Sequence, residues 1–150
     1  MKIIIDADAC PRGALAAAAS LAERYGARLV TVAGFDHVID SPEHVTVGCD
    51  PQEADIKIIN LARAGDAVVT QDIGLAAAVL GKKAAALNPC GYEYREENIS
   101  AALEEREIKA KYRRAGGRTK GPPKRTKEDD ERFAARLEQI LRRLTKDYAV

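Results

Sequence analysis

The sequence predicts an α/β protein: a three-layer sandwich with a central, mostly parallel sheet and helices on both faces, formed by a single domain over residues 1–150. Three observations lead to this prediction. Short apolar runs alternate with segments of helical period, as they do in parallel sheets. The chain has 150 residues and is 46% apolar, which suits one domain with a substantial core. Two of the apolar runs end in aspartate, a residue that is costly to bury unpaired.

The first half of the chain contains three predicted strands and two predicted helices. KIIIDA is a buried strand, and Pro11 then stands where the first turn of a helix tolerates proline, so a helix follows and ends at Gly26. ARLVTVAG is the second strand, and VTVG is the third, after the polar loop FDHVIDSPEH. The next helix begins at Glu53 and ends at Gly65, and its periodic apolar face comprises Ala54, Ile56, Ile59, Leu61 and Ala62.

The second half continues the alternation and then becomes mainly helical. DAVVTQD is an apolar strand that ends in acid, IGLAAAVLGKK is a helix, and AAALN is a short strand. From Arg95 the chain has helical character to about Ala115. The segment GGRTKGPPKRTK that follows is a loop, because its glycine and proline residues disfavour a helix. A final amphipathic helix is expected at about 128–144, with apolar residues at helical spacing: Phe133, Leu137, Ile140, Leu141 and Leu144.

Positive charge is concentrated in one segment. Residues 1–105 hold 9 Lys and Arg against 16 Asp and Glu, whereas residues 106–127 hold 10 basic residues and one acid. We expect a flexible basic arm at about 109–127 that binds nucleic-acid phosphates, and the alternative is a solvated loop. Tyr112 could stack on a base or pack on the body of the protein. The candidate contacts are Arg113, Arg114, Arg118, Lys120, Lys124 and Arg125.

Composition and cysteine usage favour a soluble cytoplasmic protein. No apolar run approaches the ~20 residues of a membrane span, and the early change from isoleucine to acid does not resemble a signal peptide. The three cysteines, Cys10, Cys49 and Cys90, have no zinc-binding spacing, so a reduced protein without disulfides is expected. His37 and His44 are expected to be bystanders. These features leave the oligomeric state open.

Several aspartates are candidates for a metal site. Asp6 and Asp8 stand two positions apart, so they point the same way if the first strand extends that far. Asp72 ends a later apolar run, and Asp55 lies near the start of a helix. Carboxylates gathered at one sheet edge repel one another unless a cation neutralises them, and Mg²⁺ and Mn²⁺ favour such oxygen ligands. Alternatively, Asp8 and Asp72 each cap the helix that follows.

Two neighbouring residues each have a functional and a structural interpretation. Cys10 lies beside the acids at a predicted helix N-terminus, where a thiol pKa falls, so it is either a supporting nucleophile or a small buried residue. Thr70 precedes Asp72 by two positions and either positions a water for the reaction or fills the end of a strand.

The segments DADACP, QEAD, VVTQDIGLA, ALNPCG, and GPP followed by EDDERFA together resemble the YaiI/YqxD family of bacterial proteins. The resemblance covers nearly the whole chain, from Met1 to about Leu144. That family is similar to the PIN-like superfamily, whose characterised members are mostly metal-dependent nucleases. The resemblance departs at Cys90, where the family usually has arginine.

The resemblance implies a PIN-like sandwich and specific acidic positions. Asp6 matches the first strand-end acid, and Asp72 with Thr70 resembles the TxD of a later strand. Asp55 matches the helix acid. Asp129 falls on an acidic position ahead of the FA pair, where it could support the site.

Together these features predict a divalent-metal-dependent nuclease that hydrolyses phosphodiesters in RNA or single-stranded nucleic acid. Magnesium or manganese would be held by Asp6, Asp55 and Asp72, and the catalytic set would be Asp6, Asp8, Thr70 and Asp72. One alternative is a non-catalytic nucleic-acid-binding module, which needs the arm but no metal. Another is a haloacid-dehalogenase-like phosphatase, which also needs a later lysine and two acids after an apolar strand, whereas Asp129 and Asp130 follow no strand.

Overall fold

The computed structural model describes residues 1–34, 41, 43–48, 50–121 and 123–148. His37 and Cys49, for which no role was expected, lie outside these residues. The strands are β1 (Lys2–Asp6), β2 (Arg28–Gly34), β3 (Glu43–Val47), β4 (Ala67–Val69), β5 (Ala85–Leu87) and β6 (Glu93–Tyr94). The helices are the short 3₁₀ turn η1 (Ala7–Ala9), α1 (Arg12–Tyr25), α2 (Pro51–Leu61), α3 (Ile73–Gly81), α4 (Glu96–Arg114) and α5 (Lys127–Tyr148).

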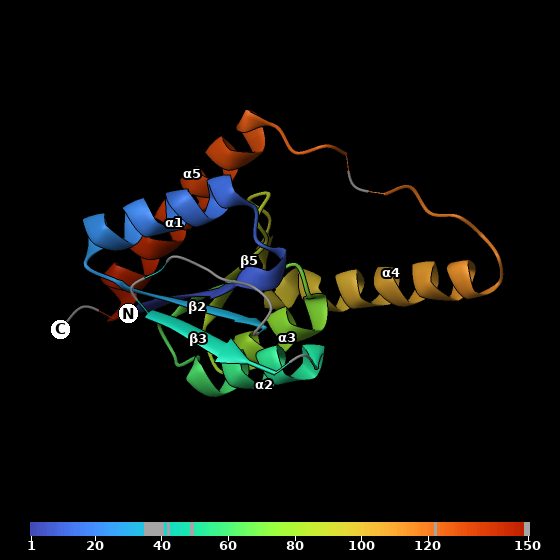
Figure 1. Cartoon of the computed structure of the whole chain (residues 1–150), viewed down its shortest axis with the longest axis horizontal. Coiled ribbons are helices and arrows are strands. Elements are labelled where there is room, and N and C mark those ends of the chain that lie inside the picture. Colours follow the sequence, from blue (N-terminus) through green and yellow to red (C-terminus); the bar gives the residue numbers. More distant parts are fainter. Residues whose placement is uncertain (35–40, 42, 49, 122, 149–150) are drawn as a thin grey trace.

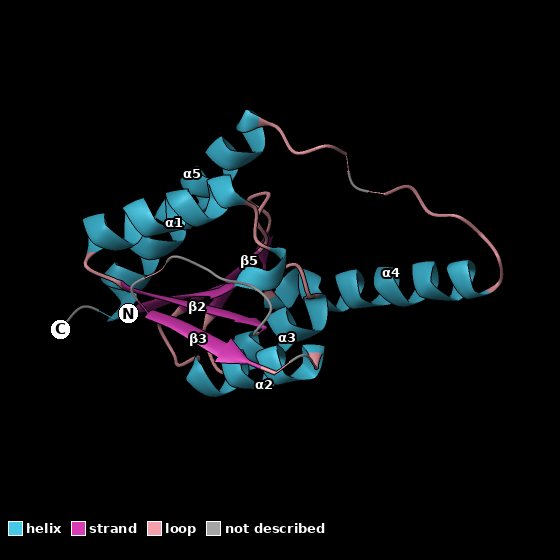
Figure 2. Ribbon diagram, in the orientation of Figure 1, coloured by secondary structure: helices cyan, strands magenta, loops and turns pink. Residues whose placement is uncertain are grey.

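The strands form one sheet in the order β3-β2-β1-β4-β5-β6. All neighbouring pairs are parallel except β5 with β6. Helices α1 and α5 pack on one face of this sheet, and α2 and α3 pack on the other (Figure 2). The predicted three-layer α/β architecture with a mostly parallel sheet is therefore confirmed.

Strands β1 and β4 are neighbours at the centre of the sheet, although more than 60 residues separate them in the chain. After β1 the chain crosses through α1 to β2, and after β4 it crosses through α3 to β5 on the other side. The two connecting helices leave toward opposite faces. This is a topological switch point, where open α/β sheets bind their ligands outside the carboxyl ends of the strands.

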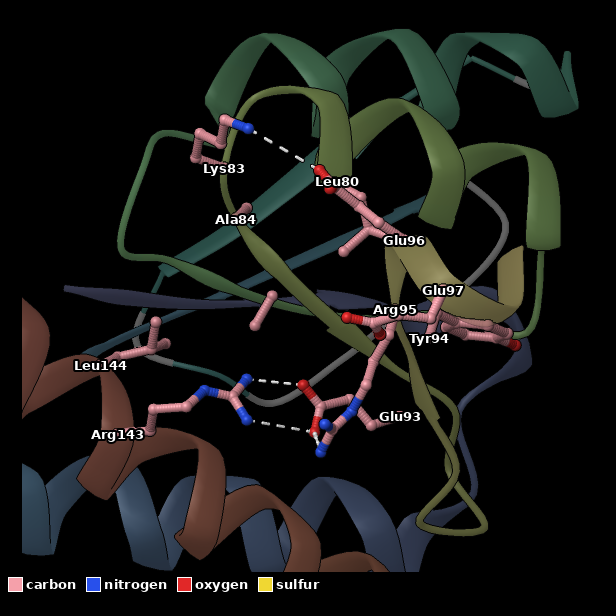
Figure 3. Close-up of a pocket in the computed structure, with 11 residues that line it drawn as sticks. Leu80, Lys83, Ala84, Glu93, Tyr94, Arg95, Glu96, Glu97, Arg143 and Leu144 are labelled. Atoms are coloured by element: carbon pink, nitrogen blue, oxygen red, sulfur yellow. Dashed lines mark hydrogen bonds and ion pairs between the residues drawn. The ribbon is translucent and has the colours of Figure 1, made fainter. Parts of the chain in front are cut away.

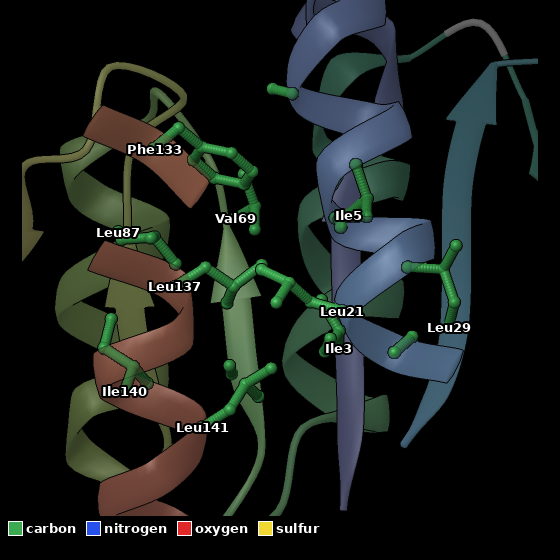
Figure 4. Packing of buried hydrophobic residues seen from close by; sticks show 14 of the residues in the cluster. Ile3, Ile5, Leu21, Leu29, Val69, Leu87, Phe133, Leu137, Ile140 and Leu141 are labelled. Carbon is green, nitrogen blue, oxygen red and sulfur yellow. The ribbon is translucent and has the colours of Figure 1, made fainter. Parts of the chain in front are cut away.

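The core explains why three isoleucines follow one another in β1. Ile3 and Ile5 point toward α1 and α5, where Phe133 and Leu137 meet them, whereas Ile4 joins the cluster under α2 and α3 (Figure 4). All five side chains are fully buried. Each contributes about 1.5–3 kcal/mol to folding through removal of apolar surface from water. The predicted apolar face of α5 is confirmed as part of this core.

Three local predictions were wrong. Strand β4 ends at Val69, so Asp72 follows this strand by three residues and does not end it. Helix α2 ends at Leu61 and buries Ile58, whereas Ile56, which was assigned to its apolar face, is 57% exposed. Strand β6 was not predicted, because two residues carry no periodic signal. Gly91 makes β6 and its loop feasible: its φ is +90°, and a Cβ there would lie 2.8 Å from the backbone of Arg132 in α5.

Helix α4 projects away from the sheet (Figure 1). None of its 19 residues is buried, and its first half packs against α3. The chain then returns through the segment after Ala115, which has no helix or strand in its described part, to α5. Among the described residues no helix is both long enough and apolar enough to cross a lipid bilayer.

Candidate active site

Asp6, which ends β1, and Asp72, which follows β4 by three residues, are joined through Thr70. The Thr70 hydroxyl donates a hydrogen bond of 2.9 Å to Asp6 Oδ2 and accepts one of 3.0 Å from the backbone N–H of Asp72. Thr70 is 1% exposed, so packing leaves it little freedom. Its position therefore fixes the direction of the Asp6 carboxylate at the switch point.

Tyr94 supports the same strand end from β6. Its hydroxyl donates to the Thr70 carbonyl oxygen at 3.3 Å, and burial raises its pKa to about 12, so it stays a donor. The Tyr94 ring also packs edge to face with Tyr92, with centroids 5.5 Å apart. The unpredicted strand therefore holds the backbone of Thr70 in place.

Asp72 is an N-cap as well as a member of the acidic group. Its Oδ1 accepts hydrogen bonds from the backbone N–H groups of Gly74 at 2.8 Å and Leu75 at 3.3 Å, which satisfies the first turn of α3. The same oxygen lies 3.4 Å from a guanidinium nitrogen of Arg106 in α4. Asp72 is therefore both the cap of α3 and a member of the acidic group.

Asp8 does not cap α1, so that part of the capping alternative is wrong. The N-cap of α1 is Pro11, which makes no side-chain cap. Asp8 lies in η1 instead, and both of its oxygens accept the N–H of Gly34, at 3.1 Å, where β2 ends. Because β1 ends at Asp6, the two acids do not share one extended strand.

Electrostatic repulsion couples the acids. The pKa of Asp55 is raised to about 6 by loss of hydration, by the charges of Asp72 and Asp6, and by a hydrogen bond with Asp72. The pKa of Asp6 is also raised, chiefly by burial and further by the charges of Asp8 and Asp72, while the Thr70 hydrogen bond opposes the rise. The fold therefore brings the charges of Asp55 in α2, Asp6 in β1 and Asp72 at the start of α3 close enough to act on one another.

The donor chemistry of this group suits a hard divalent cation, because all its ligand atoms are carboxylate oxygens. A cation would also relieve the repulsion that raises the pKa of Asp55 and Asp6. Within the described part of the chain, however, no three His, Cys, Asp or Glu side chains stand in an arrangement that could hold a metal ion.

Replacing Asp55 with asparagine is expected to stabilise the protein in a pH-dependent manner. The folded state holds the Asp55 pKa near 6 against an ordinary value of 3.8, so the folded state binds more protons between these pH values. Ionisation of Asp55 therefore lowers the free energy of unfolding as pH rises from about 4 to 6, and this loss persists at higher pH. After solvent screening, we expect Asp55→Asn to raise Tm by roughly 2–4 °C at about pH 8 and by nothing measurable at about pH 4.

Asp50→Asn is the matched control for this prediction. Asp50 caps the same helix by accepting the N–H of Gln52, and asparagine caps equally well, so its effect should be small at both pH values. Thermal unfolding followed by circular dichroism measures both variants. Equal Tm values for Asp55→Asn and the parent protein at about pH 8 would show that Asp55 carries no repulsion.

Cys10 is a poor nucleophile in this fold. Its thiol is half-buried, lies 3.6 Å from the Pro11 carbonyl oxygen, and has a pKa raised to about 11, mainly by burial. A thiol with this pKa stays protonated at neutral pH. Cys90 is exposed on the loop before β6.

The predicted basic contacts have different surroundings. Arg118, Lys120 and Lys124 are exposed on the segment between α4 and α5. At the end of α4, Arg113 donates to the Thr119 hydroxyl at 3.1 Å, and Arg114 lies 3.5 Å from Glu107. 

Arg125 acts as an anchor. Its guanidinium binds Asp130 Oδ1 at 2.6 and 2.8 Å and donates to the Pro89 carbonyl oxygen at 2.8 Å. It therefore ties the end of the basic segment to α5 and to the loop before β6.

Asp129 and Asp130 lie in the first turn of α5. Asp129 accepts the backbone N–H of Thr126 at 2.8 Å, and this bond, with Arg132 and Arg125 nearby, lowers its pKa. Both acids are therefore engaged at a helix start and do not follow an apolar strand. The phosphatase alternative gains no support from them.

Arg106 lies outside the predicted basic arm, and Lys109 lies inside it but was not named as a contact. Together with Arg113 they line a groove of about 230 Å³ between α4 and the start of α3. Their spacing of three and four residues, which places them on one helix face, was the available signal. Only the fold shows that this face begins beside Asp72.

A larger hollow, of about 390 Å³, lies at the β6 edge of the sheet, away from the acids (Figure 3). Glu93 is 8% exposed there. Its carboxylate accepts hydrogen bonds from the Arg143 guanidinium at 2.5 and 3.3 Å and from the Arg95 guanidinium at 3.2 Å. These ion pairs join β6 to α5, so we assign this hollow a structural role.

Comparisons with known proteins give consistent relatives. Residues 4–143 match the DUF188 family model, described as "Uncharacterized BCR, YaiI/YqxD family". A UPF0178 protein from Heliobacterium modesticaldum is 56% identical over 95% of this chain and 97% of its own. One from Clostridium kluyveri is 44% identical over 94% and 93%. The solved structure of Rae1 (YacP) from Bacillus subtilis aligns over 98% of this chain and 99% of its own, with 17% identity and a TM-score of 0.45, too low to support an inference.

Proposed function

The chain belongs to the YaiI/YqxD family, and we propose that it hydrolyses phosphodiester bonds in RNA or other single-stranded nucleic acid with the help of a divalent cation. The reaction would take place at Asp6, Asp55 and Asp72, which together are called the acidic edge. The observation that carries this proposal is that Thr70 links Asp6 and Asp72 beside the switch point between β1 and β4, and that the charges of both acids act on Asp55. The PIN-like relationship suggested by the motifs stays a prediction.

The proposed ligands are the carboxylates of Asp6, Asp55 and Asp72. When bound, a magnesium or manganese ion would supply Lewis-acid polarisation of a phosphoryl oxygen and lower the pKa of a water. Thr70 holds the Asp6 carboxylate in one direction, so this one proposed ligand is oriented before the cation arrives. Asp55 must lose its shared hydrogen bond with Asp72 to act as a ligand.

The positive charge of the neighbouring helix α4 and of the segment after it attracts the anionic substrate. The acidic edge alone would repel a phosphodiester, but the basic residues at 106–127 outnumber the acids there by ten to one. Arg106 brings that charge to within 3.4 Å of Asp72. Attraction of this kind raises the local concentration of an anionic substrate.

A cleavage assay with end-labelled single-stranded RNA and DNA tests the proposal. We expect cleavage in Mg²⁺ or Mn²⁺ and none in EDTA, together with heat of Mn²⁺ binding in calorimetry. A protein that neither binds Mn²⁺ nor cleaves would contradict the proposal.

The second candidate function is a nucleic-acid-binding module without catalysis. It is favoured by the finding that no three potential ligands among the described residues are already arranged to hold a metal. It predicts binding to single-stranded nucleic acid that is insensitive to EDTA and to Asp6→Asn.

A further inference from the structure

One side of α4 carries a continuous basic stripe, defined by Arg106, Lys109 and Arg113. These residues stand at i, i+3 and i+7 and therefore project from the same face of the helix. At 1.5 Å per residue, the stripe is about 10 Å long. With Ile73, Ala102 and Glu105 it lines the groove of about 230 Å³ described above.

The stripe continues the face by which α4 packs on the body. Ile99, Ala102 and Leu103 are half-buried on the first half of the helix, which lies against α3. Beyond the start of α3, the helix projects alone (Figure 1). The stripe therefore begins at Asp72 and runs outward along a helix that has no buried residue.

The present partners of the stripe are weak. Lys109 pairs with Glu105 on the same exposed helix at 2.8 Å, and Arg113 donates to the Thr119 hydroxyl. Arg106 meets Asp72 at 3.4 Å, with about half of its side chain exposed. Exposed pairs of this kind contribute little to stability, so a phosphate can replace them.

We propose that Arg106, Lys109 and Arg113 bind successive phosphates of a single nucleic-acid strand and lead it along α4 to the acidic edge. The cleavage step rests on the proposed function above, whereas binding does not. The groove sets Ile73 and Ala102 as an apolar wall beside the three cationic side chains, which suits the sugars and phosphates of one strand. When a phosphate binds Arg106, that side chain leaves Asp72, and the carboxylate becomes available at the same moment.

The test measures binding separately from cleavage, in EDTA, with a fluorescent single-stranded oligonucleotide and the matched duplex. A stripe variant carries Arg106→Gln, Lys109→Gln and Arg113→Gln. A loop variant carries Arg118→Gln, Lys120→Gln and Lys124→Gln, which removes the same charge from the connecting segment. A body variant carries Lys57→Gln, Arg63→Gln and Lys146→Gln, three exposed residues elsewhere. Circular dichroism establishes that each variant is folded.

We expect the stripe variant to bind the single strand at least ~10-fold more weakly and to lose about 2 from the slope of log K against log salt, since three contacts each contribute about 0.7. The body variant should bind within ~3-fold of the parent protein, because distant charges are screened. Equal losses in the stripe and loop variants, tighter binding of the duplex, or no binding by the parent protein would each overturn the proposal.

The two proposals fail in distinguishable ways. If the parent protein binds the strand in EDTA but never cleaves it with Mg²⁺ or Mn²⁺, the hydrolytic function fails and the stripe stands. If the protein cleaves and the stripe variant binds and cleaves normally, the stripe fails and the hydrolytic function stands.

Discussion

Asp6→Asn is expected to reduce cation-dependent cleavage by more than about 100-fold while the protein stays folded, because changes to groups that only support metal ligands already cost 10–100-fold. Asparagine is close in shape to aspartate, and its amide oxygen can still accept the Thr70 hydroxyl. It removes the negative charge that a cation requires. It also relieves the repulsion that raises the pKa of Asp6, so Tm should stay equal or rise.

Asp129→Asn provides the matched control, since it is the same substitution at an acid outside the coupled group. The groups that act on the Asp129 pKa are Thr126, Arg132 and Arg125, all near the start of α5. We expect unchanged cleavage and a slightly lower Tm, because the substitution removes the negative charge that Arg132 and Arg125 stabilise. Initial rates over a range of Mn²⁺ concentrations measure both variants. Cleavage by Asp6→Asn at the parent rate would remove Asp6 from the site.

Phe133→Ala is expected to lower the free energy of unfolding by about 3–5 kcal/mol, the usual cost of emptying a fully buried aromatic position. Phe133 is 0% exposed and packs between α5 and the central strands near Val69 (Figure 4). A loss of this size is a large part of the 5–15 kcal/mol that holds a typical domain together. Urea unfolding should therefore show a much lower midpoint with a similar slope.

Ile108→Ala is the control for Phe133→Ala, because it also shortens an apolar helical side chain. Ile108 is 60% exposed on the projecting half of α4, so its loss should change stability by less than about 0.5 kcal/mol. If the two variants unfolded at the same urea concentration, α5 would not be a full part of the core. That result would also question the anchoring of the basic segment by Arg125.

Much of the fold could be predicted because its signals are local. The isoleucine run of β1 and the 3.6-residue period of α5 depend on neighbours a few positions away, and both predictions are confirmed. The C-cap at Gly26 is confirmed by its left-handed backbone. Strand β6 lacked such a signal, since two residues have no period, and Ile56 was misplaced because the register of an apolar face depends on what packs against it.

The candidate site divides in the same way. Sequence alone placed Asp6 and Asp72 at the ends of apolar runs, because an acid there is visible without knowing any contact. It also located the positive charge. It left open whether Asp72 is a cap or a site residue, and the structure shows a cap whose charge also acts on Asp55.

Only the tertiary structure decided which distant groups meet. Thr70 binds Asp6 across 64 positions, Asp8 accepts the N–H of Gly34 across 26, and Arg106 reaches Asp72 across 34. Strand order and helix direction create these contacts, and neither is encoded in any short stretch of sequence. The same is true of Arg125, whose charge suggested a phosphate contact but whose position beside Asp130 and Pro89 makes it an anchor. A residue's chemistry is local, whereas its partner is set by the packing of the whole chain.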